Sequence, residues 1–151
     1  MNIRVARPAD AEAMARVHWL SANTAYGRDD PLERRLAASE RVFDESGTRP
    51  FLAEDDDGSV IGVLTVGDDE LYAIYVHPDH WGAGVGQALL ERAEAELAET
   101  CTAASLTCMV VNARARRFYD RNGWQLGETL VEPHFSGEPT EVCRYHKTFD
   151  T

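Results

Sequence analysis

Three glycines at alternate positions, Gly82, Gly84 and Gly86, follow an apolar strand-like run and precede a helix-like segment in the stretch IYVHPDHWGAGVGQALLERAEAEL. Each glycine raises the entropy lost on folding, so the cluster needs a physical reason. A loop between a strand and a helix N-terminus presents unpaired N–H groups and the positive end of the helix dipole, which favour an anion. The pattern therefore predicts a phosphate-binding loop. A tight turn with close helix–sheet packing is the alternative, and it explains one or two of the glycines but not three.

The spacing within this loop argues against two common nucleotide sites. A nucleoside triphosphate loop has the pattern GxxxxGK[ST], and no Lys, Ser or Thr follows the glycines here. A dinucleotide loop has GxGxxG near the chain start, in a βαβ unit with an acidic residue about 20 residues further on. The present spacing is GxGxG, after three strands that we expect to be linked by hairpins.

The elements that position this loop follow from periodicity and turn residues. Leu89, Ala93 and Leu97 recur every fourth residue among charged residues, as in an amphipathic helix, and Asp57-Gly58 is a hairpin-turn signal. The predicted elements are a strand at 2–7, helices at 8–26 and 31–46, three strands within 49–78, a helix after the glycines, a strand at 105–111, a helix at 112–123, and strands at 124–132 and 141–149. This order is typical of an α/β (α+β) fold, with a mixed sheet and helices on its faces.

Length and composition are those of one ordinary globular domain, residues 1–151. No run approaches the roughly 18 apolar residues of a membrane span, and the N-terminus lacks a signal-peptide stretch, so we expect a cytoplasmic protein that does not bind membranes. The net charge of −11 argues against a nucleic-acid partner, because a polyanion would be repelled. Cys101, Cys108 and Cys143 form no CxxC pair and are expected as free thiols, and the five histidines show no metal-ligand spacing, so no metal is expected.

Two motifs carry a family resemblance. The stretch 76–90, VHPDHWGAGVGQALL, resembles the acyl-CoA-binding motif of the GNAT superfamily of N-acetyltransferases, roughly [QR]-x-x-G-x-[GA] after a strand that ends in V-x-P. The stretch 112–124, NARARRFYDRNGW, resembles the family pattern N-x-x-A-x-x-F-Y-x-x-x-G-[FW]. The resemblance covers nearly the whole chain. It implies a mixed, mostly antiparallel central sheet of about seven strands flanked by about four helices, with acetyl-CoA as co-substrate and an amine as acceptor.

The resemblance also implies which residues meet the coenzyme. The pantetheine arm would lie along the strand before the loop, which splays from its neighbour, and the pyrophosphate would bind the loop amides. Trp81 departs from the family pattern, which usually has Arg or Gln there; Trp lacks an Arg charge, although its indole N–H could donate one hydrogen bond. The coenzyme-binding residues carried over are Ile74, Tyr75, Val76, Trp81, Gly82, Ala83, Gly84, Val85, Gly86, Gln87, Asn112 and Phe118.

The same resemblance places the catalytic groups. Tyr119 occupies the position of the general acid that faces the coenzyme sulfur, and a phenol with pKa about 10 can donate to a thiolate with pKa about 8.5; a core aromatic role is the alternative. Glu70 lies where several family members hold a carboxylate that activates the amine through water, and an exposed turn residue is the alternative. His77 is a second candidate base. Asn112 is expected as a helix N-cap, alone or while it also binds pantetheine.

Acceptor recognition in this fold usually falls to the first two helices and the last hairpin. His18, Trp19, Tyr26, His134 and Phe135 are therefore candidate lining residues, and a packing or surface role is the alternative for each. The leading function is direct transfer of acetyl from acetyl-CoA to a primary amine of a small molecule, peptide or protein, since no nucleophile pattern indicates an acyl-enzyme. The alternative is a non-catalytic acyl-CoA sensor or interaction module. The edge of the closing strand pair favours a homodimer.

Overall fold

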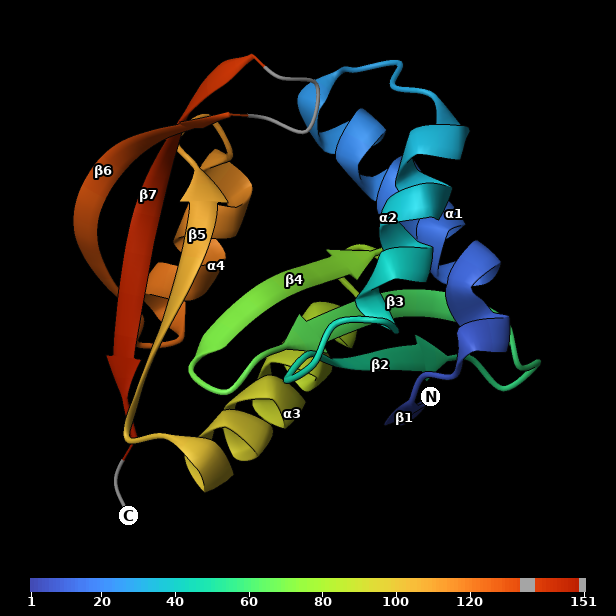
Figure 1. Cartoon of the computed structure of the whole chain (residues 1–151), viewed down its shortest axis with the longest axis horizontal. Helices are drawn as coiled ribbons and strands as arrows, with labels where there is room; N and C mark the ends of the chain where they lie inside the picture. The colour runs from blue at the N-terminus through green and yellow to red at the C-terminus, as the bar shows by residue number, and fades with distance from the viewer. Residues whose placement is uncertain (134–137, 150–151) are drawn as a thin grey trace.

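A single twisted sheet organises the molecule (Figure 1). In the computed structural model, which describes residues 1–133 and 138–149, seven strands lie in the order β1-β2-β3-β4-β5-β7-β6. Their bounds are β1 Asn2–Val5, β2 Arg49–Glu54, β3 Val60–Val66, β4 Glu70–Val76, β5 Ala103–Met109, β6 Gln125–Pro133 and β7 Pro139–Thr148. Neighbours pair antiparallel except β4 and β5, which are parallel. The predicted element order and the mixed, mostly antiparallel sheet are confirmed.

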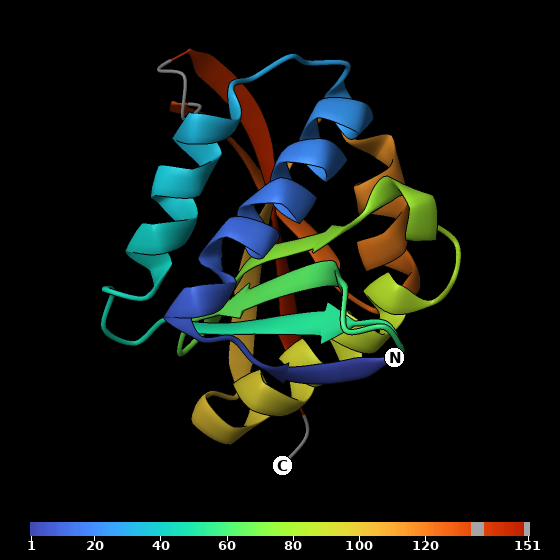
Figure 2. The ribbon, with the colours of Figure 1, turned by 90° about the vertical axis from the view of Figure 1, so that its right-hand side faces the viewer.

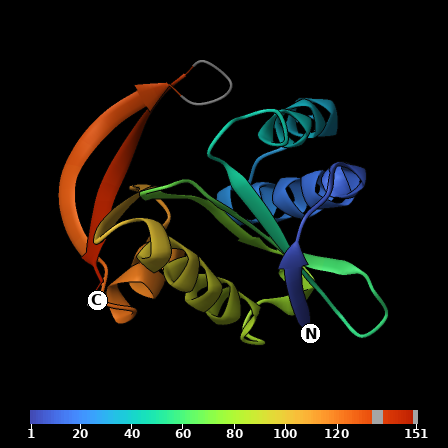
Figure 3. The ribbon, with the colours of Figure 1, turned by 60° about the horizontal axis from the view of Figure 1, so that its bottom comes forward.

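Helices cover both faces of the sheet (Figure 3). The helices of the described chain are α1 Ala11–Tyr26, α2 Leu32–Val42, α3 Val85–Thr100 and α4 Ala113–Arg121. On one face, Met14 and Val17 of α1 are buried against Leu52 and Val63 of the sheet. On the other face, the apolar side of α3 packs in the larger core, which α4 joins through Tyr119. Figure 2 shows α4 beside the start of α3, so these two helices share one end of the fold.

The helix bounds follow local chemistry. The predicted helix at 8–26 opens with a 3₁₀ turn, Pro8–Asp10, before α1 begins, and it ends at Gly27 in the left-handed region (φ 62°). The predicted helix at 31–46 is shorter than expected. Beyond Val42 the backbone tightens into bonds from residue i to i−3, including Asp44 N–H to the Arg41 carbonyl at 3.0 Å, which stop the α-helix.

β4 and β5 part soon after they meet, as the family resemblance implies. Their pairing consists of Glu70 opposite Ser105 and Leu71 opposite Leu106. The remainder of β4 pairs with β3 alone, while β5 continues beside β7. The divergence is visible in Figure 1 and leaves the backbone edge of β4 unpaired toward the site described below.

No α-helix in residues 1–133 and 138–149 combines the length and apolar character needed to cross a bilayer. Within the same residues, no three His, Cys, Asp or Glu side chains gather as a metal would require. Cys101, Cys108 and Cys143 are free thiols, and the latter two are buried.

Candidate active site

The glycine loop adopts a backbone that its sequence makes possible. Gly82 and Gly84 have φ of 81° and 87°, in the left-handed region that strains other residues, and Gly84 is the N-cap of α3. A Cβ on either glycine would meet no atom within 4 Å, so both face open space. The turn geometry alone thus accounts for two of the three glycines. Gly86 has an ordinary φ and lies close to Val76 and Phe118.

The amides of this loop divide into occupied and available groups. Ala83 N–H donates to the His80 carbonyl at 3.3 Å and is therefore engaged within the loop. The N–H groups of Val85, Gly86 and Gln87 belong to the first turn of α3 and have no acceptor within the helix. They present the positive end of the helix dipole to whatever lies in front of the loop.

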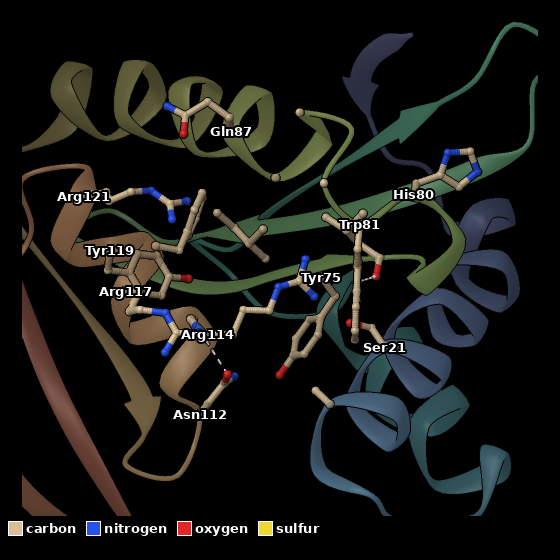
Figure 4. Close-up of a pocket in the computed structure, with 18 of the residues that line it drawn as sticks. Ser21, Tyr75, His80, Trp81, Gln87, Asn112, Arg114, Arg117, Tyr119 and Arg121 are labelled. Carbon is tan, nitrogen blue, oxygen red and sulfur yellow. Dashed lines mark hydrogen bonds between the residues drawn. The ribbon is translucent and has the colours of Figure 1, made fainter.

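A cavity of about 600 Å³ runs from this loop past the edge of β4 to α1 and α4 (Figure 4). It joins most of the residues predicted to bind the coenzyme or act in catalysis. Its lining includes Ile74, Tyr75, Val76, Trp81, Gly82, Gly84, Gly86, Gln87, Asn112, Phe118 and Tyr119, whereas Ala83, Val85 and Glu70 lie outside it. From α1 it adds Tyr26, a predicted acceptor-side residue, and Ser21 and Ala25, which the sequence did not single out.

Tyr119 is held in an aromatic cluster with its hydroxyl at the cavity. The residue is 8% exposed. Its ring centroid lies 5.3 Å from that of Phe118, 6.3 Å from that of Trp124 and 6.1 Å from that of Tyr145. Its hydroxyl makes no hydrogen bond with any residue of the described chain. Burial raises the pKa of Tyr119 far above 10, so the phenol stays protonated and available as a donor. The aromatic packing of Tyr119 and its place in the cavity lining are compatible with each other, and its role as general acid stays a prediction.

Asn112 holds two walls of the cavity together. Its side-chain oxygen accepts from Ala115 N–H at 3.1 Å, which makes it the N-cap of α4. Its Nδ2 donates to the Tyr26 hydroxyl at 2.9 Å and so links α4 to the end of α1. Burial raises the pKa of Tyr26 to about 12, and this hydroxyl therefore keeps its own proton for donation.

Trp81 turns inward rather than toward the front of the loop. Its indole N–H donates to the Val76 carbonyl at 2.8 Å, so the hydrogen bond that the sequence suggested for a phosphate is used within the protein. The Arg114 guanidinium lies over the Trp81 ring, with its central carbon 4.0 Å from the ring centroid. Figure 4 shows the Arg114 side chain extending from α4 to this ring.

Three arginines of α4 line the cavity, and sequence reasoning missed them. Arg114, Arg117 and Arg121 are spaced at i, i+3 and i+7, which places them on one face of the helix. That spacing was the available signal. None of the described residues that line the cavity is Asp or Glu, although the chain has 26 acidic residues.

The comparisons with known proteins agree with this arrangement. The family model described as "Acetyltransferase (GNAT) family" matches residues 12–124. The chain belongs to the GNAT family of acetyltransferases. It is 32% identical over 106 residues to the L-amino acid N-acyltransferase MnaT of Escherichia coli (strain K12), an alignment that covers 61% of this chain and 60% of MnaT. The chain thus spans about 60% of the length of the curated relatives that it matches.

Solved structures share the GNAT fold over almost the entire chain. A GCN5-related N-acetyltransferase from Rhodopseudomonas palustris superposes with a TM-score of 0.81 at 22% identity, and covers 98% of this chain and 95% of its own. The putative acetyltransferase YncA from Salmonella typhimurium, solved with its cofactor acetyl-CoA, gives a TM-score of 0.74 at 23% identity over 100% of this chain and 95% of its own. These neighbours establish the fold of this GNAT chain.

The candidate bases of this GNAT chain lie apart from the cavity. Glu70, at the start of β4, is paired with Arg144 at 3.5 Å, and Arg144 also donates to the Ser105 hydroxyl at 3.1 Å. Burial raises the pKa of Glu70, while the Arg144 charge opposes that rise. His77 Nδ1 accepts from Asp79 N–H at 3.1 Å in the turn after β4, so this ring has a local structural role.

The acceptor-side residues of α1 have mixed positions. His18 stacks on Tyr75 with ring centroids 3.7 Å apart, and burial followed by the Arg35 charge holds the pKa of His18 well below 6.5. Trp19 donates its indole N–H to the Asp30 carbonyl and fastens the loop after α1. His134 and Phe135 lie outside the described residues.

Proposed function

We propose that this protein transfers an acetyl group from acetyl-CoA directly to a primary amine of a small molecule or of a peptide or protein. One observation carries the proposal. The open N-terminus of α3 and the unpaired edge of β4 share a single cavity, whose lining has three arginines and no carboxylate in the described chain. Family membership and the names of relatives, N-acyltransferase among them, support the same activity.

The residues present fit coenzyme A. Gly82 and Gly84 leave open space in front of the amides of α3, where the pyrophosphate would bind, with Gly86 and Gln87 completing the cradle. Arg117 and Arg121 supply positive charge on the α4 side for phosphate groups. The edge of Ile74–Val76, with Asn112 and Phe118 opposite, would hold the pantetheine arm by backbone hydrogen bonds and apolar contact.

Bound acetyl-CoA supplies an activated thioester, and the chain positions it and handles the protons. A free backbone N–H on the edge of β4 would polarise the thioester carbonyl. The Tyr119 hydroxyl, kept protonated by burial, would donate to the sulfur as negative charge develops there. Direct transfer is further supported by Cys108: burial raises the pKa of its thiol to about 12, which disfavours a nucleophilic thiolate.

The amine must lose a proton, and Glu70 is the proposed acceptor of that proton through water. Its carboxylate lies where β4 and β5 are still paired, just before they diverge. The raised pKa of Glu70 makes it a stronger base than an ordinary carboxylate. Tyr26 of α1 and Tyr75 of β4 line the cavity and would form the wall from which the amine approaches.

The first test is calorimetric titration of acetyl-CoA, followed by a screen of amines with detection of free thiol. Gly84→Ala and Gly58→Ala form a matched pair, since both glycines have positive φ (87° and 81°) and open surroundings. Each variant should lose about 1 to 2 kcal/mol of stability through backbone strain. Only Gly84→Ala should weaken acetyl-CoA binding, because Gly58 lies in the β2–β3 turn.

Several outcomes would count against the proposal. Absence of acetyl-CoA binding would refute it, and equal weakening by the two glycine variants would remove the loop from the site. Micromolar binding of acetyl-CoA without transfer to any amine class would favour the sensor alternative.

As a further part of the proposal, the edge strand β6 would pair two copies of the chain into a homodimer. Val131 of β6 is 67% exposed, and sedimentation would detect the dimer.

A further inference from the structure

The coenzyme loop lacks a cation of its own. Trp81 stands directly before Gly82, and its only polar group is committed to the Val76 carbonyl at 2.8 Å. The loop residues that follow, 82–87, include no charged side chain. A pyrophosphate in front of α3 would therefore meet amides and the helix dipole but no formal positive charge from the loop.

Arg114 brings a cation to this place from the opposite wall. It belongs to the first turn of α4, and its guanidinium lies over the Trp81 ring at 4.0 Å (Figure 4). This cation–π contact holds the guanidinium beside the loop. Its N–H groups donate to no acceptor in the described chain, so they can face a ligand.

The charge of Arg114 is not used elsewhere in the described chain. Arg4, Arg16 and Arg144 each lie within 4.0 Å of a carboxylate, whereas no described Asp or Glu reaches that distance from Arg114. The residue is also exposed, so its guanidinium keeps access to an incoming anion. An arginine that lines a carboxylate-free cavity beside open helix amides is suited to a phosphate.

We propose that Arg114, held on Trp81, supplies to the pyrophosphate of acetyl-CoA the positive charge that the loop lacks. Trp81 then acts as a platform for an arginine from another element rather than as a direct phosphate ligand. This inference rests on the proposed use of acetyl-CoA, and it concerns Arg114 and Trp81 alone, apart from the amide cradle.

The test compares a phosphate-bearing ligand with one that has none. Acetyl-CoA and S-acetylpantetheine are titrated calorimetrically into the wild type, Arg114→Ala and Arg16→Ala; Arg16 is an exposed arginine of α1 outside the cavity. Arg114→Ala should weaken acetyl-CoA about ten- to hundredfold, as for loss of a hydrogen bond to a charged group. It should leave S-acetylpantetheine unchanged, and Arg16→Ala should change neither.

A relocation experiment tests the role of Trp81. Trp81→Leu should weaken acetyl-CoA in the wild type but add little in the Arg114→Ala background, because the two residues act as a pair. Placing the charge on the loop, in the double variant Trp81→Arg/Arg114→Ala, should recover affinity relative to Arg114→Ala. Thermal unfolding identifies variants that fail to fold. If Arg114→Ala is among them, Arg114→Gln takes its place, because Gln removes the charge but keeps a long polar side chain.

The outcomes separate the inference from the proposed function. Normal binding of acetyl-CoA by Arg114→Ala would overturn the inference alone, and so would an equal loss for S-acetylpantetheine, since Arg114 would then shape the cavity rather than bind phosphate. Failure of the wild type to bind acetyl-CoA would overturn the proposed function and this inference with it.

Discussion

Replacing Tyr119 by Phe separates catalysis from stability because of where its hydroxyl lies. The substitution removes one oxygen from an aromatic cluster and keeps the ring contacts with Phe118, Trp124 and Tyr145. The hydroxyl faces the cavity and has no partner in the described chain, so no internal hydrogen bond is lost. We expect the free energy of unfolding to change by no more than about 0.5 kcal/mol.

Turnover should respond differently from stability. A positioned general acid contributes about 10²- to 10⁴-fold, so kcat should fall at least about 100-fold, equivalent to about 2.7 kcal/mol of transition-state stabilisation. The dissociation constant of acetyl-CoA should stay within about twofold of the wild-type value, because the proposed donation strengthens only as the sulfur gains charge.

Tyr145→Phe is the matched control, since it removes a hydroxyl from the same cluster. Tyr145 is 1% exposed and does not line the cavity, and its hydroxyl accepts from Arg116 Nε at 3.5 Å. This variant should lose about 1 kcal/mol of stability with little change in kcat. Urea unfolding, calorimetry and steady-state rates on both variants complete the assay. Wild-type kcat in Tyr119→Phe, or equal kcat losses in the two variants, would refute the assignment of Tyr119 as the acid.

Three further predictions follow from other residues. Burial raises the pKa of Glu70 above the ordinary carboxyl value of 4.5, so in the wild type the acidic limb of the pH profile of kcat/KM should lie above that value. Glu70→Gln should remove this limb. A pH profile that the substitution leaves unchanged would exclude Glu70 as the base. The pKa of His18 in the folded protein lies well below its ordinary value of 6.5. The stability that neutral His18 provides is therefore complete above pH 6.5. It is lost as the pH falls below 6.5, by up to about 1.4 kcal/mol per pH unit. His18→Phe, which preserves the stack on Tyr75, should abolish that loss in urea unfolding between about pH 5 and pH 7.5. Gly62→Ala would place a Cβ 2.8 Å from Leu89 Cδ1 and 3.1 Å from Val85 Cγ1, so these buried side chains or α3 itself must shift. We expect a loss of about 1 to 3 kcal/mol of stability in thermal unfolding. If α3 moves, acetyl-CoA binding should weaken in calorimetry; an unaltered affinity would show that the side chains alone absorb the contact.

The fold was predictable where local pattern and packing agree. Leu89, Ala93 and Leu97 repeat every fourth residue, and all three are completely buried under the sheet in α3. Asp57-Gly58 forms the turn between β2 and β3 with φ of 81° at the glycine. In both cases the sequence signal and the structural constraint lie within a few residues of each other, so the constraint is visible without the tertiary structure.

The residues of the candidate site were predictable within the two motifs, on the strand before the first motif and at Tyr26, but the contacts between them were not. The Asn112 link to Tyr26 joins residues 86 positions apart, and no local pattern reports such a contact. The inward turn of Trp81 depends on the Val76 carbonyl, which is free to accept because β4 has left β5. Arg114 was within reach of a helical-spacing argument, but its stack on Trp81 required the two walls of the cavity to be placed.

Whole-chain charge and local charge point in different directions for the ligand that we propose, coenzyme A. The net charge of −11 that argues against nucleic acid would equally repel coenzyme A, which carries several phosphate charges of its own. What decides binding is local: Arg114, Arg117 and Arg121 lie on one face of α4, and no carboxylate of the described chain lines the cavity with them. Because screening limits exposed charges to about 10 Å at 0.1 M salt, these arginines can attract an anion at the cavity, while carboxylates farther away than that contribute little. A duplex contacts far more surface than this cavity offers, so the same arrangement gives a small polyanion an advantage over nucleic acid.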